Sequence, residues 1–111
     1  MIYILDQITA RIGKGAALDA LYRERYAPGA GARGMELVLT LVSPPLWLDD
    51  GENKLLYLWR LPDAAAFWRK NNLGRRDPDV RATWTAIDAL ASKRQRDTLA
   101  DPAEFATLIH G

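Results

Sequence analysis

The sequence predicts an α+β fold: a four-stranded antiparallel sheet of ferredoxin-like order β-α-β-β-α-β, with its helices on one face. Two observations carry this prediction. Apolar residues recur at every second position in segments typical of strands, and at every third or fourth position in segments typical of helices. In addition, two of the expected strands are apolar at both parities, which predicts that something also covers the face without helices.

The first strand and helix have clear signals. Residues 1–9 alternate Ile with other side chains and are followed by two glycines, so they predict a strand. Residues 16–26 place apolar side chains at helical spacing. Pro28 and Gly29 are expected to end this helix and to leave residues 27–34 as a loop.

The next two strands are apolar on both faces and are joined by a hairpin. Residues 35–43 and the stretch "NKLLYLWRL" (53–61) are apolar at both parities. The segment between them, 44–53, is rich in Pro, Asp and Gly, so it predicts a long hairpin connection.

The second helical region is predicted in two pieces. Asp63 is a plausible N-cap for a short helix that closes near Gly74. Asp77 and Pro78 then supply an N-cap and a first helical position in register, and apolar residues follow at helical spacing up to residue 91.

The C-terminal part is less regular. Residues 92–99 are expected as the fourth strand, although their polarity also fits a longer preceding helix. Asp101 and Pro102 predict the start of a final short helix. The single histidine, His110, is interpreted as a solvated tail residue, with closure over a cavity mouth as the alternative.

Length and composition limit the function. The 111 residues predict one domain over 1–111, with a core at about 1–99 and an extension at about 100–111. A net charge of +1 without a charged tail argues against nucleic acid and anionic lipid as partners. The absence of cysteine excludes disulfides. The first residues do not resemble a signal peptide, and the longest uncharged run, 37–48, is too short to span a membrane, so we expect no membrane partner and a cytoplasmic protein.

The apolar second face of the sheet predicts a homodimer. Each large apolar side chain left in water there forfeits on the order of 1.5–3 kcal/mol. A second copy of the same face, related by a two-fold axis, is the expected cover, because C2 dimers are the commonest soluble oligomers. Residues 103–109 folding over the sheet are the alternative.

Several stretches resemble the dimeric α/β-barrel superfamily, and in particular its NIPSNAP-like branch. They cover most of the chain to about Leu99: "MIYILDQITARIGKG", "LYRERYAP", "GM" before the second strand, "NKLLYLWRLPDAAAFW" and "DPDVRATW". The resemblance implies two ferredoxin-like subunits joined sheet to sheet as a homodimeric α/β barrel, with a small-molecule cavity between sheet and helices. Its members include cofactor-free monooxygenases, polyketide cyclases, haem-degrading enzymes, lyases and proteins without known activity.

One departure from that pattern narrows the chemistry. Several catalytic branches carry His-Pro-X-His where this chain has "DPDV", with Asp77 and Val80 in the histidine places. Imidazole catalysis and haem ligation are therefore not expected at this segment. With one His and no Cys, we expect no metal site and no cofactor.

Four residues are candidates for catalysis: Asp6, Tyr26, Arg25 and Arg60. Arg25 and Tyr26 share a helix face with Tyr22. Asp6 lies among isoleucines on its strand, where desolvation would raise the pKa of its carboxyl group. We hypothesise that Asp6 or a tyrosinate at Tyr26 removes a proton while Arg25 or Arg60 stabilises the anion. The alternative interpretation is structural: core tyrosines, a buried ion pair at Asp6 and rim arginines.

Seven aromatic residues are candidates for ligand binding: Tyr3, Tyr22, Tyr57, Trp59, Trp68, Trp84 and Trp47. Packing explains several of them without a ligand. Trp68 would line a pocket between helix and sheet, and Trp47 is the candidate for a lid or a dimer contact.

These observations predict a small-molecule-binding homodimer, a cofactor-independent enzyme of lyase, cyclase or monooxygenase type. Its reaction would begin with proton abstraction from a small aromatic or polyketide-like compound. The alternative is a non-catalytic protein that binds a small molecule or a partner. An RNA-binding domain, with Tyr3, Tyr57 and Trp59 as stacking residues, is a remote alternative, because the RNA-recognition sequence motif is missing.

Overall fold

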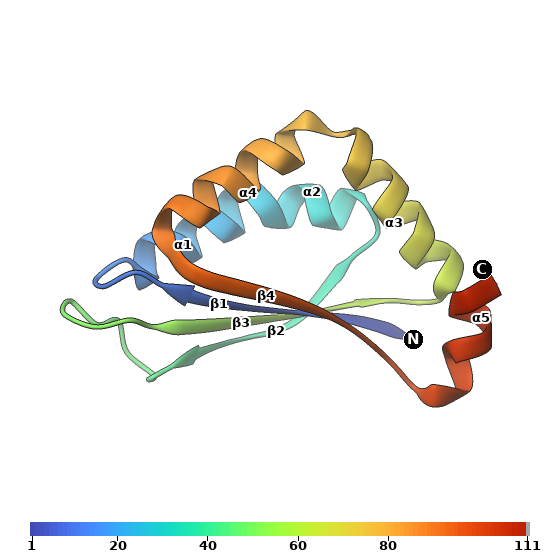
Figure 1. Ribbon diagram of the computed structural model, residues 1–111, viewed down its shortest axis with the longest axis horizontal. Coiled ribbons are helices and arrows are strands. Elements are labelled where there is room, and N and C mark those ends of the chain that lie inside the picture. Colours follow the sequence, from blue (N-terminus) through green and yellow to red (C-terminus); the bar gives the residue numbers. More distant parts are fainter. Residues whose placement is uncertain (111) are drawn as a thin grey trace.

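The computed structural model describes residues 1–110, and their side chains through Leu108. Four strands form one antiparallel sheet, and the longer helices all cover the same face of it (Figure 1). The strands are β1 (Ile2–Ala10), β2 (Glu36–Ser43), β3 (Lys54–Leu61) and β4 (Ala91–Ala100), in the order β2-β3-β1-β4. The predicted ferredoxin-like α+β fold is therefore confirmed.

The first helical region is longer than the sequence pattern predicts. It runs through α1 (Gly15–Leu21), a π-helical turn η1 (Tyr22–Tyr26) and α2 (Ala27–Ala32), so the predicted loop at 27–34 is wrong for most of its length. The Ala27 N–H bonds to the Tyr22 carbonyl, five residues back. Such a widened turn leaves room for the ring of Pro28, whose missing N–H then costs no α-helical bond. Gly34, with a positive φ of 96°, ends the region instead.

The second helical region has the two predicted pieces. Helix α3 (Ala64–Arg76) starts at Asp63, whose side chain accepts a hydrogen bond from the Ala66 N–H at 2.8 Å. Helix α4 (Pro78–Leu90) starts at Asp77, whose side chain accepts from the Asp79 N–H at 2.9 Å. Both predicted N-caps are confirmed, and α3 runs two residues past Gly74.

Residues 91–100 form the fourth strand, so the alternative of a longer α4 is wrong. Pairing with β1 along nearly its whole length explains why so polar a segment is extended. A 3₁₀ turn, η2 (Pro102–Glu104), and helix α5 (Phe105–His110) follow at the end of the sheet where the N-terminus lies (Figure 1). The prediction about the His110 side chain lies outside what the structure describes.

The two faces of the sheet differ. Toward the helices, β1 and β3 present Ile2, Ile4, Asp6, Ile8, Leu55, Tyr57, Trp59 and Leu61, all of them buried. The other face carries Tyr3, Leu5, Leu39, Leu41, Leu56, Leu58 and Leu99, which we call the open face. Of these, Leu39, Leu41 and Leu99 are 41%, 55% and 43% exposed, so α5 does not cover them. No helix within residues 1–110 is long and apolar enough to cross a membrane.

Candidate functional site

A buried network of aromatic and polar side chains lies between the sheet and the first helical region. The ring of Tyr22 stacks on that of Tyr57, with centroids 3.7 Å apart. The Tyr22 hydroxyl donates to Asp6 Oδ2 at 2.7 Å and accepts from Trp59 Nε1 at 2.7 Å. Burial, and then the charge of Asp6, raise the pKa of Tyr22 far above its usual range, so its phenol remains a protonated donor.

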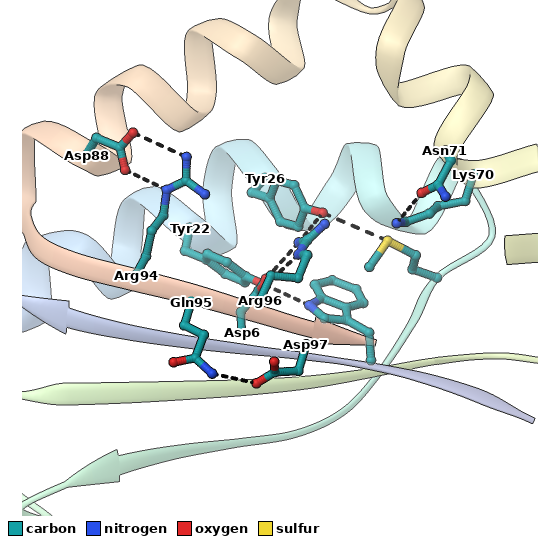
Figure 2. A network of polar contacts seen from close by, with 12 residues as sticks. Asp6, Tyr22, Tyr26, Lys70, Asn71, Asp88, Arg94, Gln95, Arg96 and Asp97 are labelled. Atoms are coloured by element: carbon teal, nitrogen blue, oxygen red, sulfur yellow. Dashed lines mark hydrogen bonds and ion pairs between the residues drawn. The ribbon is translucent and has the colours of Figure 1, made fainter. Parts of the chain in front are cut away.

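Arg96 on β4 completes this network (Figure 2). Its Nε donates to Asp6 Oδ1 at 2.6 Å and its Nη2 to Asp6 Oδ2 at 2.8 Å, a bidentate pair with a carboxylate that is 2% exposed. The same Nη2 donates to the Tyr26 hydroxyl at 2.7 Å. Both oxygens of Asp6 are thus engaged, and the carboxylate acts to position Arg96.

A pocket of about 380 Å³ opens beside Arg96, between α2, α3, α4 and β4. We call it the basic pocket, because four of its nine lining residues are basic: Arg33, Lys70, Arg75 and Arg96. The other five are Tyr26, Asn71, Gly74, Val80 and Trp84. A second pocket of about 220 Å³ shares three of these residues and is lined by Arg25, Tyr26, Gly29, Arg33, Asp77, Asp79, Val80 and Thr83.

Lys70 is the most buried cation of the basic pocket, with 8% of its surface exposed. Its Nζ donates to Asn71 Oδ1 at 2.7 Å and lies 5.1 Å from the centroid of the Phe67 ring. Burial, followed by the charges of Arg96 and Arg33, lowers the pKa of Lys70 from its ordinary 10.5 to about 8. A substantial fraction of this amine is therefore neutral near physiological pH.

The other walls of the basic pocket are aromatic. The Arg96 guanidinium carbon lies 5.2 Å from the centroid of Trp84 and 5.4 Å from that of Tyr26, and Arg33 lies 5.6 Å from the Tyr26 centroid. Arg94, which does not line this pocket, also lies 4.5 Å from the Trp84 centroid and is held by an ion pair to Asp88. Cations and aromatic faces thus line the same space.

The charges of the basic pocket are not balanced by acids. Among the side chains that the structure describes, Arg33, Lys70 and Arg75 form no ion pair, and Arg96 pairs with Asp6 alone. A cationic pocket with aromatic walls can hold an organic anion, with its negative oxygens at the guanidinium groups and its apolar part on the rings.

The structure brings some predicted site residues together. Tyr26 and Trp84 line the basic pocket, and Arg25 lines the smaller one beside it. Asp6 and three predicted ligand-binding aromatics form the layer beneath them: Tyr22, Tyr57 and Trp59, all buried. The segment "DPDV" reaches the smaller pocket through Asp77, Asp79 and Val80.

Other predicted residues lie elsewhere. Arg60 and Tyr3 are on the open face, where Arg60 makes a two-bond ion pair with Glu36, at 3.1 Å and 2.9 Å. Trp68 lies on the exposed side of α3, and Trp47, 44% exposed, lies in the β2–β3 connection beside Leu41. Tyr57 and Trp59 point away from the open face, so that face lacks the aromatic platform which the RNA-binding alternative requires.

Three functional candidates were missed by the sequence analysis: Arg33, Lys70 and Arg96. A signal existed for two of them. Lys70 follows Ala66 and Phe67 at helical spacing, and this pattern predicts that the lysine lies on the buried side of its helix. Arg96 has the parity on β4 that places it opposite Asp6 once antiparallel pairing is assumed.

No protein-family model matches the sequence, and no curated protein matches it. Solved structures do match its fold. An uncharacterized NIPSNAP domain protein from Burkholderia xenovorans gives a TM-score of 0.71 at 14% identity, covering 93% of this chain and 96% of that one. A NIPSNAP family protein of unknown function from Agrobacterium tumefaciens gives 0.69 at 16% identity, covering 97% and 93%.

A structure described as an antibiotic biosynthesis monooxygenase also matches, with a TM-score of 0.59 at 12% identity over 91% of this chain and 98% of that one. At these identities the likeness concerns the fold. The ferredoxin-like subunit fold expected from the NIPSNAP-like resemblance is confirmed. The fold neighbours include proteins without a named function and a structure described as a monooxygenase.

Proposed function

We propose that the protein is a cytoplasmic homodimer that binds a small aromatic or polyketide-like anion in the basic pocket and acts on it without a cofactor. The reaction is of lyase, cyclase or monooxygenase type and begins with proton abstraction from the bound compound. The observation that carries this proposal is the set of cations in the pocket, of which Arg33, Lys70 and Arg75 have no acidic partner among the described side chains.

Lys70 makes this set of cations informative, because it is buried without a counterion among the described side chains, while Arg33 is half-buried and Arg75 is exposed. A buried ammonium group without a counterion is costly, so a pocket that adds two more unpaired cations beside it favours an anion. Arg96 is fixed in place by Asp6 and Tyr26, which orients its donors before any ligand arrives. Such preorganised donors favour a carboxylate, an enolate or a phenolate.

The size and walls of the pocket support an organic ligand over an inorganic ion. Its volume of about 380 Å³ falls within the roughly 300–1,000 Å³ of small-molecule sites. Trp84, Tyr26 and Val80 offer ring faces and an apolar surface on one side. The apolar part of a small anion can therefore lie against the wall formed by Trp84 and Val80 while its charged end meets Arg33 and Arg96.

The proton-abstraction step follows from the state of the polar groups. Lys70, whose pKa is lowered to about 8, supplies a neutral amine that can accept a proton. Arg96 and Arg33 would stabilise the enolate or phenolate that results. A fold neighbour described as an antibiotic biosynthesis monooxygenase is compatible with this class of reaction.

Non-catalytic binding is the second candidate, and the state of Asp6 favours it. Both oxygens of this carboxylate are engaged by Arg96, and one also accepts from Tyr22, so Asp6 is not free to serve as the base suggested by the sequence. Binding without turnover by this same pocket would then be its function.

The homodimer is proposed from the open face. Six of its seven apolar side chains lie on β1, β2 and β3, and β4 adds Leu99 together with polar residues such as Lys93, Gln95 and Asp97. A second copy packed there by a two-fold axis would bury this surface and close a barrel. The pocket lies on the other side of the sheet, so it remains accessible in such a dimer.

Paired ligands test the proposal. We expect benzoate and salicylate, but not benzamide and salicylamide, to raise the melting temperature, because only the acids carry the charge that the pocket lacks. Lys70→Met and Arg33→Gln should each weaken the effect at least tenfold in apparent affinity. Arg69→Gln is the matched control, since Arg69 adjoins Lys70 on α3 but lines neither pocket. Equal stabilisation by acids and amides, or an undiminished response in both pocket variants, would remove the proposal.

A further inference from the structure

Lys70 lies in a place that few lysines occupy. It is a residue of α3 whose side chain is 8% exposed, while its neighbours Trp68 and Arg69 on the same helix are exposed. Its only hydrogen bond among the described residues goes to Asn71 Oδ1, a neutral amide oxygen. In Figure 2 its side chain extends from the helix toward the region of Tyr26 and Arg96.

The charges around the Lys70 amine disfavour its protonation. Arg96 from β4, Arg33 from the end of α2 and Arg75 from α3 line the same pocket, and Asp6 is the acid that faces it, already neutralised by Arg96. A lysine that is desolvated and next to other cations is the standard setting for an amine nucleophile. With its pKa near 8, roughly a tenth of the amine is neutral at pH 7, against well under a thousandth at the ordinary value.

The pocket also holds the groups that a carbonyl compound would need. Arg33 and Arg96 can bind a carboxylate, and the Tyr26 hydroxyl, held by Arg96 at 2.7 Å, is a polar group that can exchange a proton within the same pocket. A molecule that carries a carboxylate and a carbonyl group on adjacent or nearby carbons would thus be held by the arginines with its carbonyl toward Lys70.

We propose that Lys70 forms an imine with the carbonyl group of a small oxo acid whose carboxylate lies against Arg33 and Arg96. This inference rests on the proposed anion-binding function and specifies its substrate class. The neutral Nζ attacks the carbonyl carbon with its lone pair, and the carbonyl oxygen takes up a proton to give a carbinolamine. Loss of water then leaves a protonated C=N bond on Lys70.

The imine serves the reaction without an oxidant or a metal ion. Where the β-carbon of the bound compound carries a hydroxyl group, that hydroxyl gives its proton to water, the bond between the α- and β-carbons breaks, and its electron pair moves to the protonated C=N bond. A carbonyl fragment then leaves and an enamine remains on Lys70. Reprotonation and addition of water return the free amine and the product. Among the reaction types proposed above, this chemistry selects the lyase.

Reductive trapping tests this inference. The full-length protein is incubated with phenylpyruvate or acetoacetate and then with sodium cyanoborohydride, which converts an imine into a stable secondary amine. We expect intact-mass spectrometry to show one reduced adduct per chain, and peptide mapping to place it on Lys70, with labelling at least tenfold faster than at Lys14, Lys54 or Lys93. Lys70→Arg should abolish the adduct, and the open-face variant Lys54→Arg should retain it.

Phenyllactate, the hydroxy acid without a carbonyl group, separates the two proposals. If phenyllactate stabilises the protein but phenylpyruvate labels the four lysines equally or not at all, imine formation is refuted and anion binding stands. If neither acid binds and no adduct forms, both proposals fail. Because the site of labelling is mapped in the wild-type chain, the result does not depend on the folding of any variant.

Discussion

Replacement of Tyr22 by Phe tests the buried network that supports the site. The substitution keeps the ring that stacks on Tyr57 at 3.7 Å and removes only the hydroxyl. That hydroxyl donates to the carboxylate of Asp6 and accepts from the indole N–H of Trp59. Both partners are buried, so water cannot replace the lost contacts.

The magnitude follows from these two contacts. A hydrogen bond to a charged group is worth about 1.5–3 kcal/mol, and a buried N–H left without a partner costs about 1–3 kcal/mol. Allowing for relaxation of the site, we expect Tyr22→Phe to lower the free energy of unfolding by about 3–5 kcal/mol. For a chain of this length, roughly 4 °C per kcal/mol, this corresponds to a fall in melting temperature of about 12–20 °C.

Urea denaturation at fixed protein concentration, followed by tryptophan fluorescence, measures this change, with Tyr3→Phe as the control. Tyr3 lies on the open face and its hydroxyl makes no hydrogen bond with another described residue, so its variant should stay within about 0.5 kcal/mol of wild type. A Tyr22→Phe protein as stable as the control would refute the reasoning about the network.

Three further predictions concern charge and assembly. Between pH 8 and 10.5 the unfolded chain retains a proton on Lys70 that the folded chain has lost. Over this range the free energy of unfolding of wild type, measured by urea denaturation, should rise relative to that of Lys70→Met by up to about 3 kcal/mol. A difference between the two proteins that stays constant with pH would contradict a buried amine at Lys70. Burial raises the pKa values of Tyr22 and Tyr57, so both phenols should ionise only as the chain unfolds, and the stability that they supply should be lost as pH rises above about 10. An alkaline titration followed by phenolate absorbance measures this. Ionisation of all tyrosines in one step near pH 10 would be inconsistent with it. Leu41→Lys and Leu58→Lys each place a charge on the open face, and sedimentation equilibrium should show a dimer for wild type and monomers for both variants; a monomeric wild type at micromolar concentration would contradict the dimer.

Much of the fold was predictable because local signals agreed with the tertiary arrangement. The N-caps Asp63 and Asp77 fix where α3 and α4 begin, and their side chains make the expected bonds. The apolar residues at both parities of β3 reflect its central position, with one side buried under the helices and the other on the open face. Period and capping are local properties, and a single sequence contains them.

The helix boundary at Pro28 was predicted wrongly for a physical reason. Proline disfavours an α-helix because it removes one bond and crowds the preceding turn. The π-helical turn at Tyr22–Tyr26 relieves both effects, and the spacing of apolar residues in the sequence does not predict such a turn. The additional helical residues carry Arg33 to the pocket, so the missed boundary also concealed a site residue.

The site was less predictable than the fold because its parts come from distant segments. Asp6 was singled out correctly as a buried carboxylate in an apolar strand, but its partner Arg96 follows 90 residues later in the most polar strand. Lys70 lies on the same helix as Trp68, and the sequence analysis selected only Trp68 as a candidate there. What such residues do depends on register and on the packing of helices over the sheet, which the order of elements does not specify.

The pKa of Lys70 measures most directly whether the basic pocket is a cationic site that awaits an anion. Lysines labelled with ¹³C-methyl groups can be titrated by NMR, with Lys70→Arg used to assign the signal. We predict a pKa of about 8 without ligand and an upward shift when phenyllactate is added, because a bound carboxylate favours the ammonium form. A Lys70 that titrates near 10.5 and does not respond to any of the acids would contradict the account.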